Sequence, residues 1–345
     1  MTVPKIYRHD TPFELECGQR LEELTIAYHT YGSLNDRRDN VVWVCHALTA
    51  DSDVRLWWPG TVEPGRFLDP ARYFIVCANI LGSCYGTTGP LHTDPSAATP
   101  YYRRFPLCTI RDIVNAHRAL ARHLGISAIH ALVGSSVGGF QAVEWAVMEP
   151  SRFGRLVLIA TDAYASPWTV AIDETQRMAI ETDPTYRLDR PDGGRAGLAA
   201  ARAIGMLTYR GASGYNASQQ NAAPYDIASL HRAQTYQRHQ GDKLTRRFDA
   251  YSYMAILRSF DTHDVGRDRG GLDAALARIA CPTLVVGLTT DIIFTPGEMR
   301  SLASRIPRAQ YCEISSPYGH DGFLVEADSL NTILKPFIDS RDDKD

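Results

Sequence analysis

The sequence predicts an α/β protein in which a mostly parallel, doubly wound sheet is interrupted by a helical insertion. Short apolar, β-branched runs alternate with segments of helical periodicity through the first half, and strand character returns near the C-terminus. The stretch from Ser166 to Asp264 is instead rich in Arg, Gln, Tyr and Ala, with no convincing strand. We therefore expect a core built from residues 1–165 and 265–345, with residues 166–264 as an inserted helical cap, or lid.

The first half of the chain supplies the interior strands. Residues 40–45, apolar after Asn40, and residues 73–77 read as buried strands, because apolar runs of this length are typical of parallel strands buried on both faces. Two further runs, 128–133 and 155–160, continue the rhythm. Because helical patterns separate these runs, we expect the strands to pair in parallel.

Helices are expected on either side of the third run. One should begin at Thr109, because Asp112 stands where a capping box needs its acidic partner, and should stop at Gly125 after basic residues. A second helical stretch, 139–146, follows the strand at 128–133. Beyond the cap, the sequence predicts a strand at 282–288, a weaker strand at 310–314, a final helix at 329–340 and a disordered charged tail at 341–345.

Composition excludes several classes of function. The 345 residues suffice for one large α/β domain with an insertion, or for two domains, and a net charge of −3 gives no basic surface for nucleic acid or anionic membrane. The N-terminus lacks the apolar core of a signal peptide, so a cytoplasmic location is expected. The seven cysteines include no C-x-x-C pair, which disfavours a disulfide framework and a zinc site. Cys84, in a glycine-containing loop, is interpreted as a packing residue rather than a reactive thiol.

Residues 134–138 read Gly-Ser-Ser-Val-Gly and lie directly between a predicted strand and a predicted helix. This is the setting of a G-x-S-x-G nucleophile elbow, in which a sharp turn lifts the serine hydroxyl clear of the sheet. The flanking glycines remove side chains that would collide in the turn. A simple Gly-Ser turn is the alternative, but the strand and helix on either side favour Ser136 as a nucleophile.

A serine hydroxyl needs a base, and the base needs an acid to orient it; α/β-hydrolases supply them in the chain order serine, acid, histidine. Asp291 follows the strand predicted at 282–288, where the acid of this fold belongs, although a turn or capping aspartate is the alternative. His320 lies in a glycine-flanked loop after the last predicted strand. The predicted triad is therefore Ser136, Asp291 and His320.

The loop that follows the strand at 40–45 ends at the same edge of the sheet as Ser136. We expect it to form an oxyanion hole through the backbone N–H of Leu48, together with the N–H of Val137. His46, Asp51 and Asp53 in this loop are an alternative metal-ligand set, but their spacing matches no familiar site, and we expect no metal.

Several short motifs, spread from about residue 12 to about residue 335, occur together in an order that is specific to one family. They are Val-Cys-His-Ala-Leu-Thr (44–49), Trp-Trp-Pro-Gly (57–60), Asn-Ile-Leu-Gly-Ser-Cys-Tyr-Gly-Thr-Thr-Gly-Pro (79–90), Phe-Pro (105–106), Thr-Ile-Arg-Asp (109–112), Gln-Ala (141–142), Glu-Trp (144–145), Arg-His-Gln-Gly-Asp-Lys (238–243), Arg-Phe-Asp-Ala (247–250) and Gly-His-Asp (319–321). Through these motifs the chain resembles the homoserine O-acetyltransferase family, the homoserine and serine O-acyltransferases of the α/β-hydrolase superfamily.

The resemblance implies transfer of an acyl group from acyl-CoA to the hydroxyl of L-homoserine, an early step of methionine synthesis. Ser136 would carry the acyl group, His320 would move the protons and Asp291 would hold the imidazole. Acetyl-CoA, or succinyl-CoA, would be a cosubstrate, with no tightly bound cofactor. The family resemblance also implies a homodimer.

Amino-acid recognition in the family falls to an arginine and a tyrosine of the cap and to the aspartate after the catalytic histidine. The matching positions are Arg202, Tyr209 and Asp321. An arginine guanidinium can form two hydrogen bonds with a carboxylate, and an aspartate can form an ion pair with an ammonium group. A solvated arginine, a packed tyrosine and a capping aspartate are the alternatives.

Three departures from the family pattern leave the acyl donor and acceptor open. Met206 replaces a frequent histidine, Ala50 replaces a usual glycine, and Val137 stands where methionine or leucine is common. None removes a catalytic group, but each can reshape the pocket. Succinyl transfer to homoserine and acyl transfer to serine are the near alternatives to acetyl transfer. A serine hydrolase of the same fold and a non-catalytic binding protein are more distant alternatives to an acyltransferase.

Overall fold

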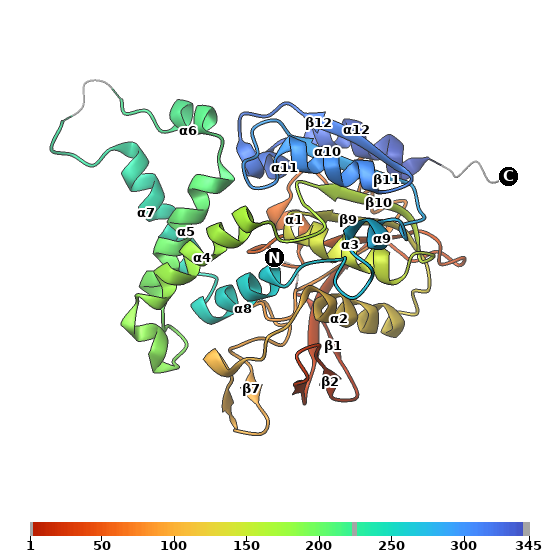
Figure 1. Ribbon diagram of the computed structural model, residues 1–345, viewed down its shortest axis with the longest axis horizontal. Helices are drawn as coiled ribbons and strands as arrows, with labels where there is room; N and C mark the ends of the chain where they lie inside the picture. The colour runs from red at the N-terminus through yellow and green to blue at the C-terminus, as the bar shows by residue number, and fades with distance from the viewer. Residues whose placement is uncertain (1–2, 223–225, 341–345) are drawn as a thin grey trace.

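The computed structural model describes residues 3–222 and 226–340, so the disorder predicted for the tail 341–345 lies outside the described residues. Its centre is an eight-stranded sheet in the order β1-β4-β6-β5-β9-β10-β11-β12 (Figure 1). The strands are β1 (Lys5–Arg8), β4 (Thr25–Tyr31), β5 (Val41–Cys45), β6 (Phe74–Ala78), β9 (Ile129–Ser135), β10 (Phe153–Ile159), β11 (Thr283–Leu288) and β12 (Ala309–Ile314). Two small ribbons pair β2 (Phe13–Glu14) with β3 (Arg20–Leu21) and β7 (Thr93–Asp94) with β8 (Thr99–Pro100).

The sheet is parallel from β6 to β12, which confirms the predicted mostly parallel arrangement. Each of the six predicted strands is present within one or two residues of its predicted ends. The antiparallel edge formed by β1, β4 and β6 was not predicted. Its strands carry polar residues among apolar ones, as in Thr-Ile-Ala-Tyr-His-Thr-Tyr of β4, and so lack the apolar run that marks an interior strand.

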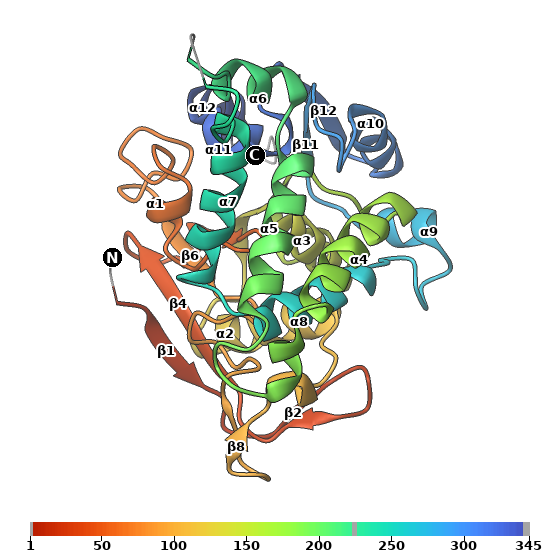
Figure 2. The same cartoon turned by 90° about the vertical axis from the view of Figure 1, so that its left-hand side faces the viewer.

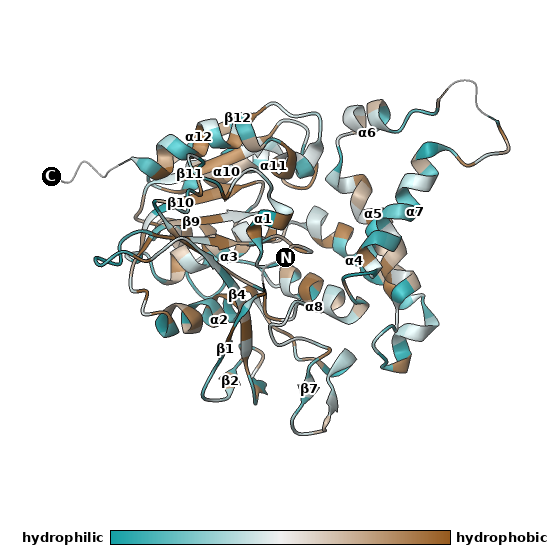
Figure 3. Ribbon diagram, turned by 180° about the vertical axis from the view of Figure 1, so that it is seen from behind, coloured by the Kyte–Doolittle hydropathy of each residue, from teal (hydrophilic) through white to brown (hydrophobic). Residues whose placement is uncertain are grey.

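Helices cover both faces of the sheet, as expected for a doubly wound fold. Helices α2 (Ile110–His123), α3 (Val137–Met148), α9 (Leu272–Leu276) and α10 (Pro296–Arg305) pack in one apolar cluster. Helices α1 (Val54–Trp57) and α12 (Ala327–Asp339) pack in the other, and α11 (Gly322–Val325) precedes α12. The capping box predicted at the start of α2 is present, with the Thr109 side chain accepting the N–H of Asp112. Figure 3 shows the strands β9 and β10 as the hydrophobic centre between these layers.

The segment 166–264 contains no strand among its described residues. Its helices are α4 (Pro167–Glu181), α5 (Arg195–Tyr209), α6 (Ala212–Ser218), α7 (Arg232–Thr245) and α8 (Ala250–Asp261), with a 3-10 turn at η2 (Pro184–Leu188). An isolated bridge between Tyr164 and Asp264 joins the two ends of the segment. Helices α4, α5 and α7 lie together on one side of the molecule, in front of α3 in Figure 2. The helical character predicted for this segment is thus present, while its division from the core as a domain stays a prediction.

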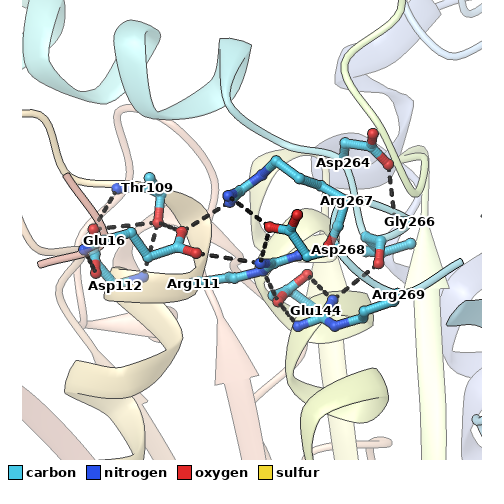
Figure 4. A network of polar contacts seen from close by, with 11 residues as sticks. Glu16, Thr109, Arg111, Asp112, Glu144, Asp264, Gly266, Arg267, Asp268 and Arg269 are labelled. Carbon is cyan, nitrogen blue, oxygen red and sulfur yellow. Dashed lines mark hydrogen bonds and ion pairs between the residues drawn. The ribbon is translucent and has the colours of Figure 1, made fainter. Parts of the chain in front are cut away.

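A network of charges around the buried Glu144 ties the chain that leaves this segment to the core. The Glu144 carboxylate of α3 accepts hydrogen bonds from Arg111 at 2.9 Å and from Arg269 at 2.5 Å and 2.9 Å (Figure 4). Arg267 pairs with Glu16 at 2.9 Å, and Glu16 also contacts Arg111. The segment that follows Asp264 is therefore anchored to α2, α3 and the N-terminal loop at once. Within the described residues, no helix is long and apolar enough to cross a membrane.

Candidate active site

The turn from β9 into α3 places Ser136 at the carboxyl edge of the sheet. Ser136 has φ 54° and ψ −128°, a conformation that costs a non-glycine residue energy and is typical of a nucleophile elbow. A Cβ atom on Gly138 would lie 2.0 Å from the Cys45 carbonyl oxygen, and one on Gly134 would lie 2.3 Å from the Gly138 carbonyl oxygen. Both glycines are therefore required by the tight approach of the strand, the turn and the helix.

The predicted triad residues are in hydrogen-bond contact. Ser136 Oγ lies 2.8 Å from His320 Nε2, and His320 Nδ1 lies 2.7 Å from Asp291 Oδ2. Asp291 follows β11, and His320 lies in a 3-10 turn, η3 (Gly319–Asp321), after β12. The other carboxylate oxygen of Asp291 accepts the backbone N–H groups of Ile293 and Phe294, so the carboxylate is fixed before it meets the imidazole. Strand ends far apart in sequence thus deliver all three groups to one edge.

The electrostatics of His320 fit a base that Asp291 supports. Burial by itself lowers the pKa of His320, but the charge and hydrogen bond of Asp291, together with the charge of Asp321, outweigh burial, so the net shift of the pKa is upward. With Nδ1–H donating to Asp291, the neutral imidazole leaves Nε2 free to accept the Ser136 hydroxyl proton. The arrangement can therefore deprotonate an alcohol and stabilise the imidazolium that results.

The loop after β5 is held by His46. Its Nε2 accepts the N–H of Ile80 at 3.2 Å, and its Nδ1–H donates to the Ala47 carbonyl at 2.9 Å. Burial lowers the pKa of His46 to about 4, so the ring is neutral. The backbone N–H groups of Leu48 and Val137 have no hydrogen-bond partner among the described residues, and both residues line the pocket described next. Two unused donors beside Ser136 can stabilise an oxyanion.

The alternative of a metal site formed by His46, Asp51 and Asp53 finds little support, because these side chains are engaged within the protein. Both ring nitrogens of His46 are engaged within the chain, Asp51 accepts the N–H of Asp53, and Asp53 accepts the Tyr31 hydroxyl at 2.8 Å. In the part of the chain that the structure describes, no group of three or more His, Cys, Asp and Glu side chains could hold a metal ion.

Burial raises the pKa of the Cys84 thiol, which disfavours a reactive thiolate.

A pocket of about 590 Å³ opens over Ser136. Seven of the eight predicted site residues line it, and the eighth, Asp291, lies behind the imidazole: the seven are Leu48, Ser136, Val137, Arg202, Tyr209, His320 and Asp321. Ala50 and Val137, two of the departures from the family pattern, also line the pocket, whereas Met206 is buried in α5 and does not. The roles of these residues stay predictions, but the fold brings their side chains to one cavity.

Helix α5 carries the predicted amino-acid clamp. The Arg202 guanidinium lies 5.3 Å from the centre of the Tyr209 ring, which lies 6.1 Å from the His320 ring. Arg202 has no ion pair among the described residues. Asp321 does have one, because Arg210 Nε lies 3.0 Å from its carboxylate. Sequence reasoning missed Arg210, which directly follows the Tyr209 that it singled out.

Sequence reasoning also missed the contribution of α4. Thr169, Ile172, Asp173 and Gln176 of this helix line the pocket beside residues of α5. Residues three and four apart lie on the same face of a helix, so the sequence could have shown that these four residues share one face. Nothing in the sequence, however, indicated that this face would turn toward Ser136 rather than toward solvent.

Comparisons with known proteins agree with this geometry. A family model described as the alpha/beta hydrolase fold matches residues 40–327. A homoserine O-acetyltransferase of Cyclobacterium marinum is 44% identical over 335 residues, covering 96% of this chain and 94% of that protein. One from Thermus thermophilus is 42% identical over 348 residues, covering 94% and 89%. The crystal structure of homoserine O-acetyltransferase from Bacillus anthracis, at 22% identity, matches with a TM-score of 0.90 over 99% of both chains, a likeness of fold.

Two relatives share more than 40% of their residues with this chain over nearly its whole length, and the α/β-hydrolase family model matches most of it. These matches assign the chain to a family. The chain belongs to the homoserine O-acetyltransferase family of the α/β-hydrolase fold.

Proposed function

We propose that the protein transfers an acetyl group from acetyl-CoA to the side-chain hydroxyl of L-homoserine, releasing CoA and O-acetyl-L-homoserine for methionine synthesis. One observation carries the proposal. The Ser136 hydroxyl, bonded to His320, opens into the same pocket as the guanidinium of Arg202, which has no ion-pair partner among the described residues. An esterase of neutral substrates has no use for a half-buried cation without an ion pair at that position.

In the first half-reaction, Ser136 Oγ attacks the thioester carbonyl while His320 Nε2 takes the hydroxyl proton. The N–H groups of Leu48 and Val137 stabilise the tetrahedral oxyanion, a contribution of about 3 kcal/mol per donor in comparable sites. The carbon–sulfur bond then breaks, and His320 returns the proton to the departing CoA thiolate. Asp291 stabilises the imidazolium in between.

In the second half-reaction, the homoserine hydroxyl attacks the acetyl group on Ser136. His320 now takes the proton of homoserine, and the second oxyanion uses the same two N–H donors. When the ester bond to Ser136 breaks, His320 gives that proton back to Ser136 Oγ. The serine is regenerated, so the two substrates need never be bound together, and ping-pong kinetics are expected.

Recognition of the acceptor falls to the cap side of the pocket. Arg202 can pair with the homoserine carboxylate, and Tyr209, between Arg202 and His320, can orient the side chain toward the base. Asp321 completes this set, although its carboxylate already has Arg210 as a counter-ion. We propose accordingly that residues 166–264 act as a cap that carries the acceptor site. The cytoplasmic location and the homodimer implied by the family resemblance stay predictions.

One experiment tests the donor and the acceptor together. The purified protein is incubated with acetyl-CoA or succinyl-CoA and with homoserine or serine, and the ester is identified by mass spectrometry. The proposal predicts O-acetylhomoserine as the main product. Succinylhomoserine or acetylserine as the main product would instead favour the near alternatives. Release of acetate and CoA with no ester would identify a hydrolase.

A further inference from the structure

The carbonyl oxygen of Ser136 is held by a side chain that the mechanism above does not use. The hydroxyl of Thr161, a fully buried residue, donates a hydrogen bond to this oxygen at 2.7 Å. The N–H groups of Gly139 and Phe140, both in α3, donate to the same oxygen at 2.9 Å and 3.3 Å. The contact from Thr161 is the shortest of these three, and it comes from outside α3.

The Ser136 carbonyl belongs to the same peptide group as the Val137 N–H. A trans peptide is planar, and its C=O and N–H point in opposite directions, so a partner that fixes the carbonyl also fixes the N–H. A hydrogen bond to the carbonyl also polarises the peptide and strengthens the N–H as a donor. The Thr161 hydroxyl therefore acts, through Ser136, on the direction and the strength of one of the two proposed oxyanion donors.

Two strained residues lie next to each other where β9 and β10 end. Ala160 directly follows β10 and is fully buried, with φ 47°, a left-handed conformation that is costly for alanine. The Ser136 N–H donates to the carbonyl of Ile159 at 2.9 Å, which places this turn beside the nucleophile. Strain of this kind persists where the surrounding structure enforces it, and it is found most often at functional sites. Thr161 is the residue that follows the strained turn.

Close packing limits the freedom of the Thr161 side chain. A Cβ atom on Gly139 would collide with Cβ, Cγ2 and Oγ1 of Thr161, so this glycine lets the side chain pack directly on the backbone of α3. On its other side, the backbone N–H of Thr161 lies 3.2 Å from the sulfur of the buried Met299. The hydroxyl is therefore held against the Ser136 carbonyl.

The other proposed oxyanion donor is oriented in the same way. The Leu48 N–H shares a peptide group with the Ala47 carbonyl, which accepts the Nδ1–H of His46 at 2.9 Å and the N–H of Ala50 at 3.1 Å. Each donor peptide is thus fixed at its carbonyl by one buried side chain and by backbone N–H groups of its own turn or helix.

We propose that Thr161 is a positioning residue of the oxyanion hole, which orients the Val137 N–H by holding the Ser136 carbonyl. Thr161 is fully buried and is not among the described residues that line the pocket, so it acts through Ser136 and not on the substrate. The inference rests on the proposed function, because it assigns a residue to the oxyanion hole of that reaction. Both half-reactions use this hole, so both should depend on the Thr161 hydroxyl.

The test is Thr161→Val, which keeps the branched shape of the side chain and removes its hydroxyl. Acylation of Ser136 is measured with acetyl-CoA and with p-nitrophenyl acetate, and deacylation is measured with homoserine. We expect each rate to fall about 10- to 100-fold, because the Val137 N–H remains but is less well directed. The dissociation constant of CoA should stay unchanged. Thr161→Ser, which keeps the hydroxyl, should recover most of the rate.

The carbonyl stretching frequency of the acetyl-enzyme separates positioning from a general structural role. Hydrogen bonds from the oxyanion hole lower the stretching frequency of the ester carbonyl on Ser136. With an acetyl group isotopically labelled at the carbonyl carbon, infrared difference spectra should show a higher frequency in Thr161→Val than in wild type. Thr161→Ala carries the same predictions and replaces Thr161→Val if the latter does not fold.

Thr283→Val is the matched control, because Thr283 is equally buried and donates to the Cys281 carbonyl at 3.2 Å at the start of β11. It should keep the wild-type rates and frequency. Wild-type rates or an unchanged frequency in Thr161→Val, an equal loss in Thr283→Val, or no recovery in Thr161→Ser would overturn the inference. If p-nitrophenyl acetate acylates Ser136 but acetyl-CoA does not, the proposed function fails while the role of Thr161 is still tested. If neither acylates it, both fail.

Discussion

His320 Nε2 and Ser136 Oγ are 2.8 Å apart, and this distance follows from local constraints on each side chain. Ser136 is held on a strained turn with φ 54°, and His320 is held by an Asp291 carboxylate that two backbone N–H groups fix in turn. Strain and buried charge both cost stability, so they persist where the surrounding packing enforces them. At the residue scale, the geometry needed for proton transfer is already present before a substrate binds.

The pKa of His320 predicts the acid side of the pH profile. Only the neutral imidazole can accept the serine proton, and Asp291 raises its pKa above the ordinary histidine value. We therefore expect kcat/KM for acetyl-CoA to fall as the pH drops through a value above about 6.5. Asp291→Asn should move this limb to lower pH and slow the reaction roughly 10³- to 10⁴-fold. An acid limb below 6.5 in wild type, or one that the variant leaves in place, would contradict the role of Asp291.

At the scale of elements, the parallel strands were the most predictable part of the molecule. Strands β5 and β6 are buried along most of their length, so their sequences are apolar throughout and their ends are readable. The antiparallel strands β1 and β4 and the orientation of α4 were not predicted, because their sequences mix polar and apolar residues and their positions depend on the segments that pack on them. Ser136, Asp291 and His320 follow parallel strands, and their contact was predicted. The pocket-lining face of α4 and the ion pair of Arg210 with Asp321 were missed.

The turn between β9 and α3 gives a prediction at this scale. Gly138→Ala would place a Cβ atom 2.0 Å from the Cys45 carbonyl oxygen, so either the loop that holds Leu48 or the start of α3 must move. We expect a loss of about 1–3 kcal/mol in the free energy of unfolding and of about 100-fold in kcat/KM. Gly297→Ala is the matched control, because its Cβ would meet only Thr295 Oγ1 at 3.8 Å. Urea unfolding and steady-state kinetics on both variants test this prediction. Equal losses of stability and of kcat/KM in the two variants would contradict the claim that the close approach at Gly138 requires glycine.

Across the whole molecule, the site is assembled from segments that the sheet and the cap bring together. His320 and Asp291 follow the C-terminal strands, Ser136 follows β9, and Leu48 lies in the loop after β5, while α4 and α5 add further residues to the lining of the pocket. The chain order serine, acid, histidine allowed Ser136, Asp291 and His320 to be predicted. The position of the helices in 166–264 could not be predicted, because it depends on contacts between segments that are far apart in the sequence, such as those of α5 with the turn that carries His320.

The network of charges around Glu144 gives a prediction about stability. Glu144→Gln removes the buried negative charge that Arg111 and Arg269 share on α3. Arg111 keeps its contact with Glu16, but Arg269 has no other ion pair among the described residues. We expect the free energy of unfolding to fall by about 3 kcal/mol, because breaking a buried ion pair leaves an uncompensated charge. Glu313→Gln is the reference, since its pair with the exposed Arg300 should contribute about 1 kcal/mol or less. Chemical denaturation of both variants measures the difference, and similar losses would mean that the buried network has no special role.

The central claim is that Ser136 carries the acetyl group between two substrates, and direct detection of that intermediate tests it best. The protein is mixed with acetyl-CoA alone, quenched in acid, digested and analysed by mass spectrometry, with Ser136→Ala as the control. We predict one acetyl group on Ser136, none in the variant, and its transfer to homoserine when the acceptor is added. Turnover to O-acetylhomoserine with no acetylated Ser136, or in the Ser136→Ala variant at near-normal rate, would contradict the mechanism.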